Sequence, residues 1–211
     1  MQPVWRAPAL PLDVLRQAGT ATHCPRDMII FAQATAADSV YYLEEGLVKI
    51  DVASPQGKRA VIGLLGADSF FGEDALAGQP LRHATASTLI ASRLLRVPKA
   101  AIEGLLHDPV FAQQLIVHLA QRSSRAEENL IDLLFNSTEK RLARALLLLA
   151  NLDSEAQPVL SLVNQQTLAE IVGTTRPRIN HFIGKFRKRG FVSTQGQLRV
   201  HSSLAQVMLE D

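Results

Sequence analysis

The 211-residue chain has a single cysteine, Cys24. One thiol cannot close an intramolecular disulfide, and an iron–sulfur cluster needs several cysteine thiolates. We therefore expect neither feature, and we expect no haem. Two interpretations of Cys24 stay open: a packed structural residue or a redox-sensitive thiol.

Long apolar runs are also missing. The longest purely aliphatic run, residues 145–150, is much shorter than the roughly 20 residues that cross a bilayer. The N-terminus has early prolines and lacks the charged segment followed by an apolar segment that marks a secretion signal. We expect a cytoplasmic protein that does not bind membranes.

The six histidines do not cluster, and no His-x-His pair occurs. A metal site in a cupin-like β-barrel enzyme requires neighbouring histidine and carboxylate ligands, and no nucleophile–base pair stands out. We expect no metal site and no catalytic residue. Such an enzyme, with an incidental helical tail, is the alternative class; substantial turnover or a tightly bound metal would support it.

The composition is otherwise that of a folded protein, with 47% hydrophobic and 20% charged residues. Its charge is unevenly distributed. Residues 1–135 hold 12 Lys/Arg and 14 Asp/Glu, whereas residues 136–211 hold 10 and 6. The C-terminal part therefore carries the positive charge that contacts to nucleic-acid phosphates need.

Residues 164–190 have the pattern of two short helices joined by a tight turn. The first helix is predicted over residues 165–172, because Asn164 is a good N-cap residue. Gly173 follows it and tolerates the positive φ at which many helices end. The second helix is predicted to begin at Thr174 or Thr175.

This second helix has two different faces. Pro177 suits its first turn, where a missing N–H costs nothing. Between residues 176 and 190 there are six Lys/Arg and no acidic residue. These features predict a helix-turn-helix whose second helix lies in a DNA major groove; a basic surface helix is the alternative. The apolar face comprises Ile179, Phe182, Ile183 and Phe186, and the polar residues largely off it are Arg176, Arg178, Asn180, His181, Lys185 and Lys188.

Short apolar or alternating runs separated by turn residues predict a compact β-roll or barrel between about residues 22 and 97. Residues 47–52 alternate in polarity, which predicts a half-buried strand, and residues 54–59 predict a hairpin tip. The roll is either purely structural or holds a small ligand. Strands are expected at residues 28–31, 39–43, 46–54, 59–65 and 91–97.

Residues 70–88 interrupt the strand pattern. A turn at Gly72 and one helical turn after it are predicted there. The open amides of that turn, together with Arg82, would form an anion site, because an arginine can contact a phosphate through two parallel hydrogen bonds. Glu73 would accept from a sugar hydroxyl. A surface ion pair between Glu73 and Arg82 is the alternative.

A long helix is predicted from Pro109, with Asp108 as its cap. A seam with alternating steps of three and four residues suits a coiled-coil-like dimer, and a second apolar stripe is expected to pack on the β-roll. We favour a homodimer over a monomer with one long core helix, because helix-turn-helix proteins usually read two symmetric half-sites. The seam comprises Ala112, Leu115, Leu119, Arg122, Ala126, Asn129 and Leu133, and the stripe comprises Phe111, Leu130, Ile131 and Leu134.

A break at residues 136–139 indicates a hinge. Beyond it we expect a helix over residues 140–152 and a short strand over residues 158–163. A β-hairpin over residues 191–202, turning at Gln195-Gly196, would make the helix-turn-helix a winged one. The predicted fold is α+β, with a β-roll effector-binding-like domain (1–107), a dimerisation helix (108–136) and a winged helix-turn-helix DNA-binding domain (137–211).

In order and spacing, these segments resemble the Crp/Fnr family of bacterial transcription regulators over nearly the whole chain. The resemblance rests on residues 71–73, Arg82, residues 139–143 and residues 168–176. It implies a homodimer that binds palindromic double-stranded DNA, contacts RNA polymerase and is switched by an effector in the β-roll.

The resemblance also implies roles for single residues. Gly72, Glu73, Arg82 and His83 take the positions that bind a cyclic nucleotide, although His83 stands where a small hydroxyl residue is expected. Arg176 matches the arginine that reads guanine, whereas Pro177 replaces a glutamate that reads cytosine in many members, so the operator should differ. Further candidates are Arg178, Asn180 and His181 for base edges, and Gln165, Lys185 and Lys188 for phosphates.

The identity of the effector stays open between three alternatives. The first is cyclic AMP or cyclic GMP, although Arg125, Ala126 and Glu127 do not match the Thr-Ser pair that meets the purine in cyclic-AMP-binding members. The second is a cyclic dinucleotide, whose second phosphate would meet Arg122 or Arg125. The third is an unknown effector or none at all.

Overall fold

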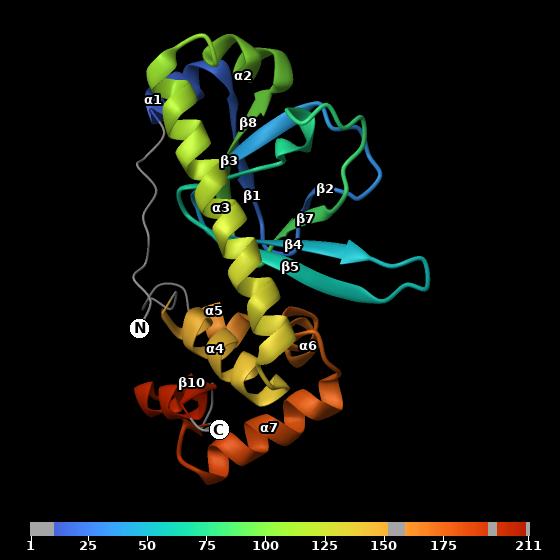
Figure 1. Cartoon of the computed structure of the whole chain (residues 1–211), viewed down its shortest axis with the longest axis vertical. Coiled ribbons are helices and arrows are strands. Elements are labelled where there is room, and N and C mark those ends of the chain that lie inside the picture. The colour runs from blue at the N-terminus through green and yellow to red at the C-terminus, as the bar shows by residue number, and fades with distance from the viewer. Residues whose placement is uncertain (1–10, 152–158, 194–197, 210–211) are drawn as a thin grey trace. The chain divides into compact units, whose positions relative to one another are not determined.

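The computed structural model describes residues 11–151, 159–193 and 198–209 (Figure 1). The chain divides into two compact units, residues 1–58 with 62–127 and residues 59–61 with 128–211. Helix α3 (Pro109–Phe135) belongs to the first unit up to Glu127 and to the second from Glu128 onward.

The first unit is a β-roll of two four-stranded sheets, ordered β1-β8-β3-β6 and β2-β7-β4-β5. Strand β3 pairs antiparallel with both of its neighbours, so that Tyr41 lies opposite Arg96 on β8 and opposite Phe71 on β6. The strands are β1 (Thr20–Cys24), β2 (Ile29–Phe31), β3 (Ser39–Glu45), β4 (Leu47–Ala53), β5 (Arg59–Gly66), β6 (Ser69–Phe71), β7 (Thr85–Thr88) and β8 (Ser92–Pro98).

These sheets confirm the predicted β-roll. The hairpin tip between β4 and β5 is also confirmed, since the Ser54 N–H donates to the Lys58 carbonyl at 2.8 Å. Strands β1, β6 and β7 were not predicted. Strands β1 and β7 consist mostly of small and polar residues and lack the apolar run that marks β2, and β6 has only three residues.

The sheet β1-β8-β3-β6 separates two hydrophobic cores. Adjacent residues on a strand face opposite sides, so Tyr41 packs between the two sheets while Tyr42 packs on the other side. Helices α1 (Leu12–Ala18), α2 (Lys99–Leu105) and the start of α3 cover this second core. Their buried contributions are Leu15, Ile102, Phe111 and Leu115.

Strand β4 corrects the prediction of a half-buried strand. Leu47 and Asp51 lie on the face predicted to be exposed, yet they are only 2% and 1% exposed. The buried charge of Asp51 is balanced by the Lys49 ammonium, 3.6 Å from its Oδ1. An interior strand with a paired charge can therefore bury both faces.

Helix α3 begins as predicted, because the Asp108 carboxylate accepts from the Val110 N–H at 2.9 Å. The faces of the helix differ from the prediction. Leu115, expected in the dimer seam, packs in the core of the roll. Phe111, Leu115 and His118 are buried on one face of the helix, and half-buried Arg122 follows on the same face. Because Leu115 and Arg122 face the roll, the seam does not form as predicted. Phe111 packs on the roll as expected, whereas Leu130, Ile131 and Leu134, also expected to pack there, are exposed.

The second unit is helical with a small hairpin. Asn136 and Ser137 separate α3 from α4, as predicted. The predicted strand over residues 158–163 is wrong, because residues 159–162 form a helix; a short, mostly apolar segment suits either structure. The elements are α4 (Thr138–Asn151), α5 (Val159–Leu162), α6 (Gln165–Val172), α7 (Arg176–Lys188), β9 (Val192–Ser193), β10 (Arg199–Val200) and the 3₁₀ helix η2 (Ser202–Met208).

The hairpin after α7 is present, since β9 and β10 pair antiparallel. Its predicted turn at Gln195-Gly196 lies outside the described residues. Within the ranges that are described, no helix combines the length and the apolar character needed to cross a membrane.

Candidate functional sites

The turn between α6 and α7 is fixed by local hydrogen bonds. The Asn164 side chain accepts from the Thr167 N–H at 2.8 Å, and Gly173 has a left-handed backbone with φ 68°. Both predicted ends of α6 are therefore confirmed. Thr175 holds the N-cap position of α7 but makes no side-chain capping hydrogen bond.

Helix α7 has one buried face and one exposed basic face. Ile179 and Phe186 are fully buried, and Phe182 and Ile183 are half-buried, as the apolar pattern predicts. The polar residues named from the sequence are all on the surface. Arg176, Arg178, Asn180, His181, Lys185 and Lys188 are exposed on α7, and Gln165 is half-buried at the start of α6.

These side chains take part in two contacts within the protein. Arg176 Nε donates to Gln165 Oε1 at 3.4 Å. The two terminal nitrogens of the guanidinium take no part in this hydrogen bond. Lys185 Nζ lies 2.8 Å from Glu139 Oε2 on α4. Lys185 would therefore have to exchange this carboxylate for a phosphate in order to contact DNA.

Gly72 opens the predicted helical turn, the 3₁₀ helix η1 (Glu73–Ala75). Its φ of 82° is left-handed, and a Cβ there would lie 3.0 Å from Arg82 Nη1 and 3.2 Å from Tyr41 Cδ2. Both the conformation and the space require glycine at this position.

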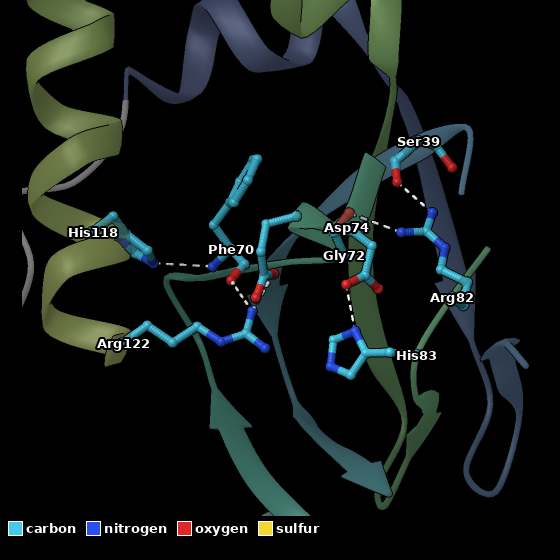
Figure 2. Close-up of polar contacts among 9 residues, drawn as sticks. Ser39, Phe70, Gly72, Asp74, Arg82, His83, His118 and Arg122 are labelled. Carbon is cyan, nitrogen blue, oxygen red and sulfur yellow. Dashed lines mark hydrogen bonds and ion pairs between the residues drawn. The ribbon is translucent and has the colours of Figure 1, made fainter. Parts of the chain in front are cut away.

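Arg82 lies inside the roll, as Figure 2 shows, and is only 2% exposed. Its Nη1 donates to the Gly72 carbonyl at 2.8 Å and its Nη2 donates to the Ser39 carbonyl. The guanidinium carbon lies 4.3 Å from the centre of the Phe31 ring. In this structure the guanidinium binds backbone carbonyls and an aromatic face of its own chain.

Glu73 pairs with α3, not with Arg82. The Arg122 guanidinium donates to the Glu73 carboxylate. It also donates to the Phe70 carbonyl at 3.3 Å, as Figure 2 shows. The two side chains are 26% and 28% exposed, so solvent reaches the pair. The sequence suggested Arg122 as part of the dimer seam or as a contact for a second phosphate; the structure pairs it with Glu73.

His118 is a site residue that the sequence did not indicate. One turn before Arg122 on α3, its Nε2 accepts from the Phe70 N–H at 3.0 Å. Burial, and then the cations of Arg125 and Arg122, lowers the pKa of His118. The neutral imidazole is therefore the form that makes this hydrogen bond.

His83 is the most open of the predicted ligand residues, with a side chain 57% exposed. Its Nδ1 contacts the Asp74 carboxylate (Figure 2). Gly72, Glu73, Arg82 and His83 are thus grouped around η1, but only Glu73 and His83, together with Arg122, present charged or titratable groups to solvent.

The described part of the chain contains no group of three or more His, Cys, Asp or Glu placed to hold a metal ion. Cys24 is buried, and burial raises the pKa of its thiol. A higher pKa disfavours the reactive thiolate, which supports the packed-residue interpretation.

Two family models match the chain. A cyclic nucleotide-binding domain matches residues 21–108, which include strands β2 to β8 and all of β1 except its first residue. A Crp-like helix-turn-helix domain matches residues 140–203, which include α6, α7 and the hairpin.

The chain is similar to the CRP-like cAMP-activated global transcriptional regulator of Mycobacterium tuberculosis, with 29% identity over 178 residues, 82% of this chain and 80% of that protein. The transcriptional regulator SdrP of Thermus thermophilus is 29% identical over 160 residues, 74% of this chain and 75% of that protein. Among solved structures, the c-di-GMP responsive global regulator CLP of Xanthomonas campestris matches with a TM-score of 0.77 at 20% identity, covering 90% of this chain and 98% of that chain. At that identity the structural likeness concerns the fold.

Proposed function

The chain belongs to the Crp/Fnr family of DNA-binding transcription regulators, and from this premise we propose that it acts in the cytoplasm as a homodimer on palindromic DNA, with an effector site in its β-roll. The observation that carries the proposal is the exposed basic face of α7 on a capped helix-turn-helix. We retain the division into residues 1–107, 108–136 and 137–211, include RNA polymerase as a partner, and assign no catalytic role.

On the DNA, Arg176 is proposed to read a guanine. Its Nε contacts Gln165, so the two terminal nitrogens are available for the O6 and N7 acceptors of the base. Arg178, Asn180 and His181 occupy the same exposed first turns of α7 and are assigned to neighbouring base edges.

Three residues are assigned to phosphates, where they fix the position of the helix without reading sequence. Lys188 is exposed at the C-terminal end of α7, and Gln165 stands at the start of α6. Lys185 is the third, in exchange for its Glu139 contact.

Selection of binding sites from random duplex DNA tests this assignment. We expect an enriched palindrome that binds two copies of the chain. Enrichment of a single unrepeated half-site, or no enrichment, would contradict the proposal of a symmetric dimer.

The dimer is proposed to form along the face of α3 that points away from the roll. Along this face, exposed residues recur in alternating steps of four and three, the spacing of a two-stranded coiled coil. Three of them are large and apolar: Ile116, Leu130 and Leu134 are 66%, 54% and 65% exposed. Small or polar residues lie between them at Ala120, Ser123 and Glu127.

In the roll, the proposed effector site comprises Gly72, Glu73, Arg82 and His83, with Arg122 added from α3. An anion in solvent can approach His83 and Arg122 directly. To reach Arg82, it must displace the carbonyls of Gly72 and Ser39. A cyclic nucleotide or cyclic dinucleotide fits this charge pattern, in line with the named ligands of the Mycobacterium tuberculosis and Xanthomonas campestris proteins.

A regulator without a diffusible effector is the second candidate. It is favoured by the pairing of Glu73 with Arg122 and by the binding of Arg82 to its own backbone, since both charges already have partners.

Calorimetric titration with cyclic AMP, cyclic GMP and cyclic di-GMP separates the two candidates. Micromolar binding that is weakened by both Arg122→Gln and His83→Ala would support the effector site. No heat with any of the three, together with tight binding of the ligand-free chain to its selected DNA, would support the second candidate.

A further inference from the structure

A cavity of about 160 Å³, partly open to solvent, lies in the β-roll next to the proposed effector site. It is lined by residues of both sheets: Thr22 and Cys24 on β1, Met28 before β2, Ile30 on β2, Tyr41 on β3, and Leu94 and Arg96 on β8. None of Gly72, Glu73, Arg82 and His83 lines it.

The lining has apolar residues and a polar end. Cys24 and Leu94 are fully buried, and Met28 is 39% exposed. Tyr41 and Arg96, which lie opposite each other on β3 and β8, form the polar end. The Arg96 guanidinium is held in place by Asp38, 3.0 Å from its Nη2, and by Ser39, 3.2 Å from its Nε.

The size of the cavity limits what it can hold. Drug-sized ligands and cofactors occupy sites of about 300–1,000 Å³, so a nucleotide does not fit. An engineered apolar cavity of about 150 Å³ binds benzene, which is close to the size found here. The cavity therefore suits a single six-membered ring or a chain of similar volume.

We propose that this cavity is a binding site for a small single-ring molecule that carries one oxygen acceptor, such as a carboxylate. The ring packs on Cys24 and Leu94, and the oxygen accepts from Arg96 at the polar end. A buried apolar body with one oriented polar contact is the usual composition of a small-molecule site.

Tyr41 connects this cavity to the neighbouring effector site. Its ring lines the cavity and stacks on Phe71 with the ring centres 5.3 Å apart. Phe71 directly precedes Gly72, and the Arg82 guanidinium carbon lies 5.8 Å from the Tyr41 ring centre. A bound ring would therefore touch a side chain that also packs beneath the effector site.

Calorimetric titration of the full chain with benzoate tests the proposal. We expect saturable binding that Arg96→Met weakens about tenfold or more, because a charge-assisted hydrogen bond is lost. Arg93→Met is the matched control: Arg93 is on the same strand but on the opposite face, paired with Glu44 and Glu45. Equal weakening by both variants, or no binding by the wild-type chain, would overturn the proposal.

One further measurement locates the ligand. Cys24→Met places a larger side chain in the lining of the cavity and is expected to abolish benzoate binding while the circular dichroism spectrum is retained. Binding that persists in Cys24→Met would place the ligand elsewhere and overturn the proposal.

Discussion

The backbone N–H of Phe70 donates to Nε2 of His118 across 3.0 Å. The carbonyl of the same residue accepts from Arg122 at 3.3 Å, so both polar groups of one peptide residue are held by side chains of α3. This residue lies two positions before Gly72. The long helix and the proposed effector site are thus joined by hydrogen bonds within one unit.

Acid is expected to weaken this contact. Because His118 has a lowered pKa in the folded chain, the unfolded chain binds the proton more readily. The stabilisation by His118 is complete above its ordinary pKa of 6.5 and is lost as the pH falls toward and through the lower folded value. Thermal unfolding followed from pH 7.5 to 5.5 should show a fall in melting temperature that His118→Gln makes shallower. His107→Gln, at an exposed histidine, is the control. If the melting temperature fell equally steeply with pH in the unchanged chain and in both variants, His118 would not have this role.

The Glu73–Arg122 pair is expected to contribute modestly to stability, since it is partly exposed. A double-mutant cycle with Glu73→Gln and Arg122→Met should give a coupling energy of about 0.5–1 kcal/mol. Urea unfolding of the full chain and the three variants measures it. A coupling energy of zero would mean that the two side chains do not pair in solution.

Comparison of alanine substitutions at Gly72 and Gly78 separates the cost of a strained backbone from the cost of contacts made by the added Cβ. Both have a positive φ, of 82° and 75°, but a Cβ at Gly78 would meet nothing within 4 Å. Gly78→Ala should cost about 1 kcal/mol for the left-handed conformation alone. Gly72→Ala should cost about 2–3 kcal/mol, because it also displaces Arg82 and Tyr41. If urea unfolding gave the same loss of unfolding free energy for both variants, Arg82 and Tyr41 would not crowd position 72 in solution.

The exposed face of α3 is expected to hold the homodimer together. Replacing Leu130 and Leu134 by aspartate puts two charges at the proposed interface and should convert a dimer into a monomer in light-scattering measurements. Leu148→Asp on α4, at another exposed leucine, should leave the dimer intact. If the double variant stayed dimeric, the dimer interface would not lie on this face of α3.

Features fixed by contacts between residues near each other in the sequence were predicted correctly, whereas features fixed by distant residues were not. The ends of α6 depend on Asn164 and Gly173, which act within one turn, and they were predicted correctly. The burial of Arg82 depends on the Ser39 carbonyl, 43 residues away, and on the Phe31 ring. No local pattern records such contacts, so the sequence predicted Arg82 as a phosphate contact but not its burial against these groups.

The phase of α3 shows the same limit. Leu115 and Leu133 are equally apolar in the sequence, but only Leu115 meets the core of the roll. The side of a helix that faces a sheet depends on the partner, which the periodicity of the helix does not specify. For the same reason the sequence did not point to His118.

Specific reading of DNA by α7 is the central claim, and the most direct test is the affinity of Arg176→Ala for the selected site and for its single-base-pair variants, measured by fluorescence anisotropy beside Lys188→Ala. Arg176→Ala should lose about 1–3 kcal/mol on the selected site and stop discriminating at one base pair of each half-site. Lys188→Ala should weaken binding to all sequences alike and reduce the salt dependence by about one phosphate contact. If Arg176→Ala lost the same affinity on every sequence and kept full discrimination, α7 would not read the DNA through Arg176, and the claim would be contradicted.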